Sequence, residues 1–244
     1  MANHNNVADN LHTVRARIAA AAAQFHQNPD RIALMCVSKT FPAQDVESAI
    51  AAGATDFGEN YVQEGVEKIN ALQRYRHDIR WHFIGPLQSN KTRDVAETFD
   101  WMHSVDREKI AHRLSEQRPV TMKPLQICIQ VNVSGEDSKS GVNPKEAGAL
   151  ALAVSSMPRL TLRGLMAIPE PTDDIALQRA RFAQLTKLFT EIRSTLPSSA
   201  KGSFDTLSMG MSADLESAIA ESIPEATTMV RIGTALFGAR PARA

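Results

Sequence analysis

Cysteine is scarce in this chain of 244 residues: only Cys36 and Cys128 occur, each inside an apolar run. Free thiols in such runs usually behave as small buried hydrophobes, so no disulfide framework is predicted. The motifs H-E-x-x-H, C-x-x-C, G-x-x-x-x-G-K-[ST] and G-x-S-x-G are all missing. Zinc hydrolysis, P-loop nucleotide chemistry and serine-esterase chemistry therefore have no support, and we expect no metal site.

The chain also lacks an excess of either charge sign, because 27 Lys and Arg residues balance 27 Asp and Glu residues. Without a basic field, neither a nucleic acid nor an anionic membrane is an expected partner. The Ala-rich stretch 18–23 is too short to cross a bilayer. Residues 1–10 lack the basic and apolar segments of a signal peptide, so we expect a cytoplasmic protein.

Apolar residues make up 43% of the chain and charged residues 22%, which is enough material for a globular core. A length near the ~250 residues typical of β/α barrels favours one domain over residues 1–244. No stretch rich in Pro, Gly and Ser is long enough to separate two domains. We therefore expect a single domain.

Short runs of β-branched and apolar residues alternate with longer stretches of helical spacing, which is typical of βαβ units and a parallel sheet. The predicted strands are residues 32–38, 56–58, 81–85, 101–105, 125–133, 162–168, 206–209 and 229–237. An amphipathic helix over residues 7–25, within an N-terminal segment 1–30, precedes the first strand. Eight parallel strands close a barrel, so the sequence predicts an α/β protein with a single TIM-like (β/α)8 barrel.

Two helix starts can be recognised by their capping residues. Asn60 followed by Gln63 fits a capping box after the second predicted strand. Asn143 followed by Pro144 supplies an N-cap with proline in the first helical position. Both positions support the alternation of strands and helices.

Lys39 directly follows the first predicted strand. In a β/α barrel the functional groups gather where the strands end, at the C-terminal face. Burial lowers the pKa of a lysine, and its neutral amine can then form an imine with a carbonyl compound. From position alone an exposed or ion-paired lysine is the commoner case, so Lys39 by itself does not define a site.

Small and hydroxyl-bearing residues lie at and after the end of the seventh predicted strand and within the eighth. Barrels often bind phosphate with the loops after these two strands, through backbone N–H groups that small residues leave accessible. The candidates are Ser208, Ser212, Gly233 and Thr234. Ordinary turn and helix-capping chemistry explains the same residues, and Ser212 in that case only starts a helix.

Arg231 lies within an otherwise apolar strand. A permanently charged guanidinium needs an acceptor there, since burying it unpaired is costly. The acceptor is either a carboxylate in a structural ion pair or a heteroaromatic nitrogen of a bound cofactor. An imine-forming lysine, a phosphate-binding loop and an arginine for a ring nitrogen together match pyridoxal 5′-phosphate.

Several motifs resemble, in order, those of the pyridoxal phosphate homeostasis protein family, the YggS/PROSC group. They are residues 37–40 (VSKT), 57–64 (FGENYVQE), 82–91 (HFIGPLQSNK), 138–141 (SKSG), 164–169 (GLMAIP), 207–212 (LSMGMS) and 230–234 (VRIGT). The resemblance runs from about residue 32 to residue 240. It implies a barrel similar to the alanine racemase N-terminal domain and a role in holding and delivering pyridoxal phosphate.

Carried over by motif, the resemblance assigns roles to individual residues. It makes Lys39 the Schiff-base lysine and Arg231 the partner of the pyridine nitrogen. It assigns the phosphate to Ser208, Gly233 and Thr234, and it places Asn60, His82 and Met166 along the ring. Two departures concern cofactor transfer: Phe41 and Pro42 stand where many relatives are basic, and the tail after Arg240 carries no lysine.

Binding without strong catalysis is the predicted activity, and no catalytic residue is assigned. Arginine at the ring nitrogen favours an unprotonated pyridine, which is a weaker electron sink. A racemase of the alanine racemase type is the alternative. Such a racemase needs a second acid/base, which in racemases with this barrel is a tyrosine presented through a second domain, and the only tyrosines here are Tyr61 and Tyr75. A cofactor-free Schiff-base aldolase or phosphosugar isomerase using Glu59, His82 and Glu170 leaves Arg231 unexplained.

Pyridoxal phosphate is thus the predicted bound molecule, and pyridoxal-phosphate-dependent apo-enzymes are the predicted recipients. The missing second domain of racemases removes one familiar dimer interface, which favours a monomer. The sequence leaves open which enzymes receive the cofactor, how tightly it is held and what Lys139 does.

Overall fold

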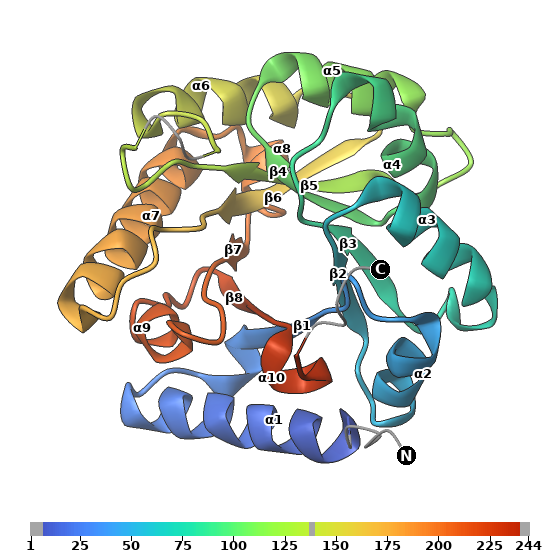
Figure 1. Cartoon of the computed structure of the whole chain (residues 1–244). Coiled ribbons are helices and arrows are strands. Elements are labelled where there is room, and N and C mark those ends of the chain that lie inside the picture. The colour runs from blue at the N-terminus through green and yellow to red at the C-terminus, as the bar shows by residue number, and fades with distance from the viewer. Residues whose placement is uncertain (1–6, 137–139, 240–244) are drawn as a thin grey trace.

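The computed structural model describes residues 7–136 and 140–239 and shows a closed barrel of eight parallel strands in the order β1-β2-β3-β4-β5-β6-β7-β8 (Figure 1). The strands are β1 Ile32–Val37, β2 Asp56–Glu59, β3 Arg80–Phe83, β4 Trp101–Val105, β5 Leu125–Gln130, β6 Leu160–Met166, β7 Thr206–Ser208 and β8 Thr227–Ile232. β8 pairs with β1, with Arg231 beside Met35, and this pairing closes the sheet. The predicted barrel is confirmed.

Helices surround the barrel in Figure 1. They are α1 Val7–Gln24, α2 Ala43–Ala51, α3 Val62–Ala71, α4 Thr92–Thr98, α5 Glu108–Gln117, α6 Pro144–Ser155, α7 Ile175–Thr195, α8 Ser198–Lys201, α9 Leu215–Ala220 and α10 Thr234–Phe237. Three short 3-10 turns are Pro29–Arg31, Gln73–Tyr75 and Ser89–Lys91. The predicted N-terminal helix is confirmed as α1, which packs against α2, α9 and α10 and so covers the side where the barrel closes.

Two predicted strands were too long. The fifth ends at Gln130: the Val131 N–H still donates to Met166 of β6, but the Asn132 N–H donates to Val142 in a loop and not to a neighbouring strand. The eighth ends at Ile232, because Gly233 leaves the extended conformation (φ −116°, ψ −76°) and starts α10. An apolar run that continues from a strand into a buried helix shows no break in its hydropathy.

The two predicted helix starts had different outcomes. Asn143 caps α6 as expected, and its side chain accepts a hydrogen bond from the backbone N–H of Lys145. The predicted capping box at Asn60 is wrong. Helix α3 begins at Val62 after Tyr61, with no side-chain cap, and Asn60 instead lines a pocket at the barrel mouth.

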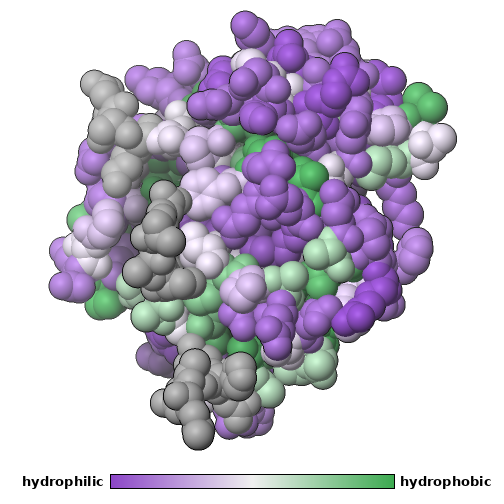
Figure 2. All heavy atoms as spheres, turned by 45° about the vertical axis from the view of Figure 1, so that its right-hand side comes forward, coloured by the Kyte–Doolittle hydropathy of each residue, from purple (hydrophilic) through white to green (hydrophobic). Residues whose placement is uncertain are grey.

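The main hydrophobic core lies between the barrel and its helices, with fully buried aromatic residues such as Phe57, Trp81 and Phe99. Both cysteines are buried free thiols. The face in Figure 2 is mostly hydrophilic, and apolar side chains reach it only in limited areas. No helix in residues 7–136 and 140–239 is both long and apolar enough to cross a membrane.

Candidate cofactor site at the barrel mouth

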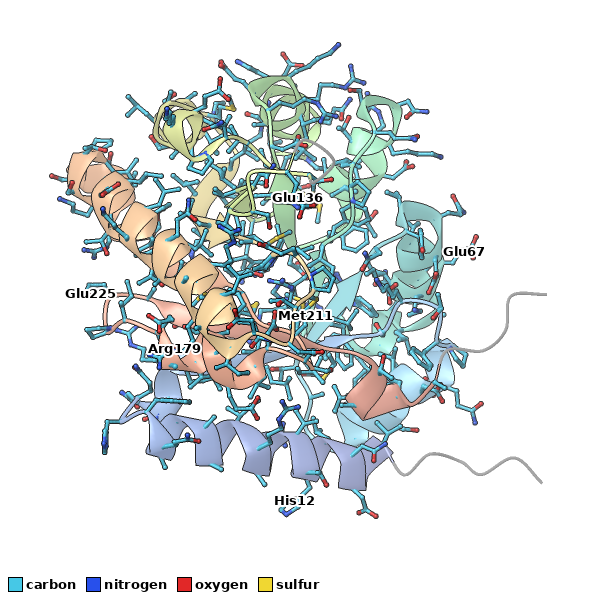
Figure 3. The ribbon with its side chains drawn as sticks, turned by 60° about the vertical axis from the view of Figure 1, so that its left-hand side comes forward. His12, Glu67, Glu136, Arg179, Met211 and Glu225 are labelled. Carbon is cyan, nitrogen blue, oxygen red and sulfur yellow. The ribbon has the colours of Figure 1, made fainter. Side chains whose placement is uncertain are left out.

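A pocket of about 290 Å³ opens at the C-terminal ends of the strands. It brings together five of the predicted site residues from opposite ends of the chain: Lys39, Asn60, Arg231, Gly233 and Thr234. Ser212 and Met211 from the loop after β7 also line it, and Figure 3 labels Met211 near the centre of the molecule. Apolar side chains complete the wall: Val37, Phe41, Ile84 and Ile168.

Close backbone contacts shape this pocket. A Cβ added to Gly85 would lie only 2.1 Å from the carbonyl oxygen of Asn60, so a larger residue at position 85 would displace that loop. A Cβ on Gly233 would lie 3.2 Å from the carbonyl oxygen of Val37. Glycine therefore allows residue 85 to approach the end of β2 and residue 233 to approach the end of β1.

A buried ion cluster holds the backbone on both sides of Lys39. Lys68 of α3 donates to the carbonyl oxygen of Ser38 (2.8 Å) and pairs with Glu59 (2.6 Å) and Glu64 (3.1 Å). The Ser38 hydroxyl donates to Glu59 (2.6 Å), and the Thr40 N–H donates to Glu64 (2.5 Å). The turn that presents Lys39 is thus fixed by side chains that do not line the pocket.

The same cluster keeps Thr40 in a rare conformation. Its φ of 70° lies in the left-handed region, which a β-branched residue seldom adopts. The bond from its N–H to Glu64 stabilises that conformation. Burial raises the pKa of the Glu59 carboxyl, and the Lys68 ammonium opposes that rise.

Arg231 is buried beneath the pocket and still reaches it. Its Nη1 donates to the Ser208 hydroxyl (2.9 Å) and its Nη2 to the carbonyl oxygen of Ala167 (2.9 Å). No carboxylate among the described residues lies within 4.0 Å of its guanidinium. Burial lowers the pKa of Arg231 to about 10, so the side chain remains a cation at neutral pH. The ion-pair interpretation of Arg231 therefore fails for the described residues.

A chain of buried hydrogen bonds continues from Arg231 through the barrel interior. Ser208 bonds to His103 Nδ1 (2.9 Å), and His103 Nε2 bonds to His82 Nδ1 (2.9 Å). His82 Nε2 bonds to Asp56 (2.9 Å), which forms an ion pair with Arg80 (2.6 Å) at the opposite end of the barrel. Burial alone would raise the pKa of Asp56, but its bonds to Arg80 and His82 hold that pKa well below its ordinary value.

The two ends of this chain fix its direction. Arginine can only donate, and a carboxylate can only accept. Burial, with His82 and Arg231 nearby, holds the pKa of His103 well below its ordinary value, so its imidazole is neutral. Each donor in the chain has one acceptor when both imidazoles carry a single proton on Nε2.

We expect nitrogen NMR of the uniformly labelled protein to show His82 and His103 as Nε2–H tautomers. His103 should still be neutral at pH 6.5, near the ordinary histidine pKa of about 6.5, because burial lowers its pKa. Asp56→Asn removes the fixed acceptor and should mix the tautomers, whereas Asp30→Asn on the surface should not. Nδ1–H tautomers in the wild-type protein would contradict this assignment.

Three predicted site residues do not line the pocket. His82 and Ser208 belong to the buried chain, and Met166 packs with Trp101 and Cys128 inside the barrel. The Ser208 hydroxyl is fully buried and bonded to Arg231 and His103, so the structure gives it no free direction toward a phosphate. All three therefore lie behind the pocket wall and act on a ligand only through other residues.

Sequence reasoning missed the roles of Asp56, His103 and Lys68. His103 alternates with the outward-facing Met102 along β4, so periodicity could have placed it inside the barrel. No sequence signal identifies its partners, because they come from β3 and β7. The same holds for Lys68, whose contacts come from two strand ends and its own helix.

Comparison with known proteins first defines the class of this barrel. A family model described as alanine racemase, N-terminal domain, matches residues 8–241. An alanine racemase from Corynebacterium glutamicum superposes with a TM-score of 0.67 at 16% identity, over 96% of this chain and 61% of that chain. The second match supports the fold alone.

More similar proteins identify the family. The chain is 55% identical to a pyridoxal phosphate homeostasis protein from Pseudomonas aeruginosa over 97% of its length and 96% of the relative. A protein of the same name from Haemophilus influenzae is 51% identical over 96% of both chains. PipY from Synechococcus elongatus, solved with PLP bound, has a TM-score of 0.80 at 35% identity over 95% of this chain and 100% of that chain. The chain belongs to the pyridoxal phosphate homeostasis protein family.

Proposed function

We propose that this protein binds pyridoxal 5′-phosphate as a Schiff base on Lys39 and acts in intracellular vitamin B6 homeostasis and delivery. The observation that carries the proposal is the convergence of Lys39, Arg231 and the Gly233–Thr234 turn on one pocket. Lys39 would hold the aldehyde carbon and Arg231 the ring nitrogen. The hydroxyl of Ser212 and the N–H groups that begin α10 would hold the phosphate.

The residues present fit this cofactor. Asn60 lines the pocket, and its Oδ1 is a buried oxygen without a hydrogen-bond partner among the described residues. Pairing with a polar ligand would remove the cost of leaving such atoms unsatisfied. When bound, pyridoxal phosphate supplies an aldehyde for imine formation and a ring that can accept electrons. Arg231 would donate to the ring nitrogen, which would keep that nitrogen unprotonated and make the ring a weaker electron acceptor.

The proposed protein binds pyridoxal phosphate without strong catalysis, and this distinguishes it from a racemase. The alanine racemase neighbours support only a shared fold, since the chain covers 61% of the C. glutamicum protein. Tyr75 lies in the 3-10 turn before β3, at the opposite end of the strands from Lys39, and Tyr61 is a half-exposed residue before α3. A loaded protein that interconverts D- and L-alanine no faster than free pyridoxal phosphate supports the homeostasis role.

The cofactor-free aldolase or isomerase has little geometric support. Of its proposed acid/base groups, Glu59 belongs to the Lys68 cluster and His82 to the buried chain. Glu170 pairs with Arg181 (2.6 Å), and despite the opposing effect of burial that pair and Ser134 lower its pKa to about 2. None of the three lines the pocket.

Cytoplasmic location, a monomeric state and delivery to apo-enzymes complete the proposal. Lys139, which could take part in transfer, lies outside the described residues. The direct test of binding is to titrate the protein with pyridoxal phosphate, follow the visible absorbance and reduce with borohydride. A visible band that reduction converts into one stable covalent adduct supports the proposal, and the absence of any adduct refutes it.

A further inference from the structure

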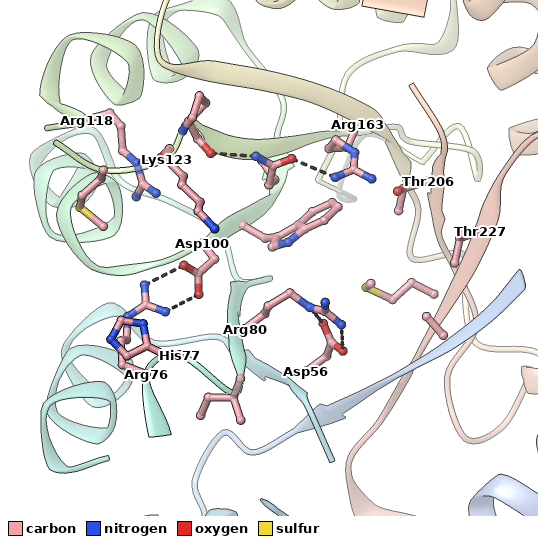
Figure 4. Close-up of a pocket in the computed structure, with 17 residues that line it drawn as sticks. Asp56, Arg76, His77, Arg80, Asp100, Arg118, Lys123, Arg163, Thr206 and Thr227 are labelled. Atoms are coloured by element: carbon pink, nitrogen blue, oxygen red, sulfur yellow. Dashed lines mark hydrogen bonds and ion pairs between the residues drawn. The ribbon is translucent and has the colours of Figure 1, made fainter. Parts of the chain in front are cut away.

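A second and larger cavity, of about 660 Å³, opens at the opposite end of the barrel (Figure 4). Its lining includes Asp56, Arg80, Trp101 and Arg163 from the first residues or inner faces of β2, β3, β4 and β6. None of the residues that line the Lys39 pocket contributes to it. It is therefore a separate space with its own lining.

Most of the charged residues in this cavity form ion pairs. Arg80 pairs with Asp56 (2.6 Å) and Arg76 with Asp100 (2.7 Å). Arg163 pairs with Asp205 (2.7 Å) and lies 4.8 Å from the centre of the Trp101 ring. These three guanidinium groups are neutralised one for one.

Arg118 and Lys123 remain without a carboxylate. Among the described residues, no carboxylate oxygen lies within 4.0 Å of either cation. Figure 4 shows both side chains turned toward the same end of the cavity, beside the Arg76–Asp100 pair. Two positive charges therefore face the cavity in excess of the negative ones.

Arg118 is a buried residue of the cavity wall, held in place by several hydrogen bonds. It is only 2% exposed, and its Nε and Nη1 donate to the carbonyl oxygens of Lys123 (2.8 Å), Ala96 (2.7 Å) and Phe99 (2.7 Å). Its Nη2 makes no hydrogen bond within the described part of the chain. Burial lowers the pKa of Arg118, and the nearby Asp100 carboxylate opposes that effect.

Capping of α4 explains part of this arrangement. The carbonyl end of a helix carries a partial negative charge, and Arg118 and Arg76 both donate to carbonyls at the end of α4. A helix end offsets only about half a charge, whereas Arg76 already has Asp100 as its partner. The excess on Arg118 and Lys123 remains after capping is counted.

We infer that this cavity binds a small phosphomonoester through Arg118 and Lys123. A phosphate group carries close to two negative charges at neutral pH, which matches the two cations without carboxylate partners. The volume exceeds what a free phosphate fills, and Ile79, Met122 and Met229 supply apolar walls for a compact organic group. The inference does not depend on the proposed function of Lys39.

The test is calorimetric titration of the full chain with inorganic phosphate and with phenyl phosphate, neither of which can form a Schiff base. We expect phenyl phosphate to bind more tightly than phosphate, with a dissociation constant below about 1 mM. Lys123→Met should weaken binding at least about tenfold, which corresponds to about 1.4 kcal/mol. Lys145→Met, an exposed lysine on α6, should leave it unchanged.

Ser212→Ala locates the bound phosphate, because Ser212 lines the other pocket. The inference is supported if Lys123→Met abolishes phosphate binding and Ser212→Ala does not affect it. The reverse pattern places the phosphate in the Lys39 pocket and overturns it, as does binding that neither variant changes. Equal affinity for phosphate and phenyl phosphate would contradict the inference that the ligand is a phosphate ester, and would indicate a site for inorganic phosphate.

Discussion

Replacing Lys68 by methionine is expected to lower the free energy of unfolding by about 3–5 kcal/mol. Lys68 is 5% exposed and is the only cation paired with Glu59 and Glu64 in the described structure. Without it, the fully buried Glu59 carboxylate loses its counter-ion, and the Ser38 carbonyl loses a donor. Removing one partner of a buried ion pair is costly because the other charge stays behind.

Urea unfolding of the cofactor-free protein measures this effect. The exposed variant Lys145→Met should change the free energy of unfolding by less than about 0.5 kcal/mol. Adding Glu59→Gln to Lys68→Met should restore part of the loss, because the stranded carboxylate becomes neutral. A loss below about 1 kcal/mol for Lys68→Met would show that the cluster does not hold the Lys39 turn.

Replacing Arg231 by glutamine is expected to weaken pyridoxal phosphate binding by about 10- to 100-fold. A hydrogen bond from a charged donor contributes about 1.5–3 kcal/mol, and each 1.4 kcal/mol corresponds to a factor of ten. Glutamine is neutral and shorter, so it cannot present the same donor to the ring while bonding to Ser208 and Ala167. Fluorescence or absorbance titration with the cofactor gives the dissociation constant.

Arg179→Gln is the matched control, because Arg179 pairs with Glu221 on the surface, away from the pocket. Figure 3 shows Arg179 on α7. It should leave the affinity unchanged. Equal affinity of Arg231→Gln and wild type, with both proteins folded by circular dichroism, would remove Arg231 from the site.

The sequence was sufficient to predict the barrel and the ends of strands that form the pocket. Strand ends are marked by a change from apolar to polar residues, as at Lys39, and a parallel barrel gathers those ends at one face. That geometric rule placed Lys39 at the mouth, whereas Arg231 was joined to it only by matching the groups that pyridoxal phosphate needs and by the family resemblance. The same rule did not separate residues that line the pocket from those behind it.

The hydrogen-bond and ion-pair partners of the site side chains could not be predicted from the sequence. Ser208 ends β7 and Arg231 is the second-last residue of β8, and only the packing of β6, β7 and β8 shows that one bonds to the other. Asn60 had the spacing of a helix cap, but a pocket-lining position took precedence over that local preference. The hydropathy of a residue predicts whether it is buried but not which side chain it contacts. The buried hydrogen-bond chain from Arg231 to Asp56 therefore could not be predicted from the hydropathy pattern.

Intact-mass analysis after borohydride reduction, on wild type and Lys39→Ala loaded with pyridoxal phosphate, tests the central claim most directly. Lys39→Ala removes the amine while leaving the Glu59–Lys68–Glu64 cluster in place. We expect one reduced cofactor on the wild-type protein and none on the variant. An adduct of equal yield on Lys39→Ala would show that another lysine holds the cofactor and would contradict the assignment.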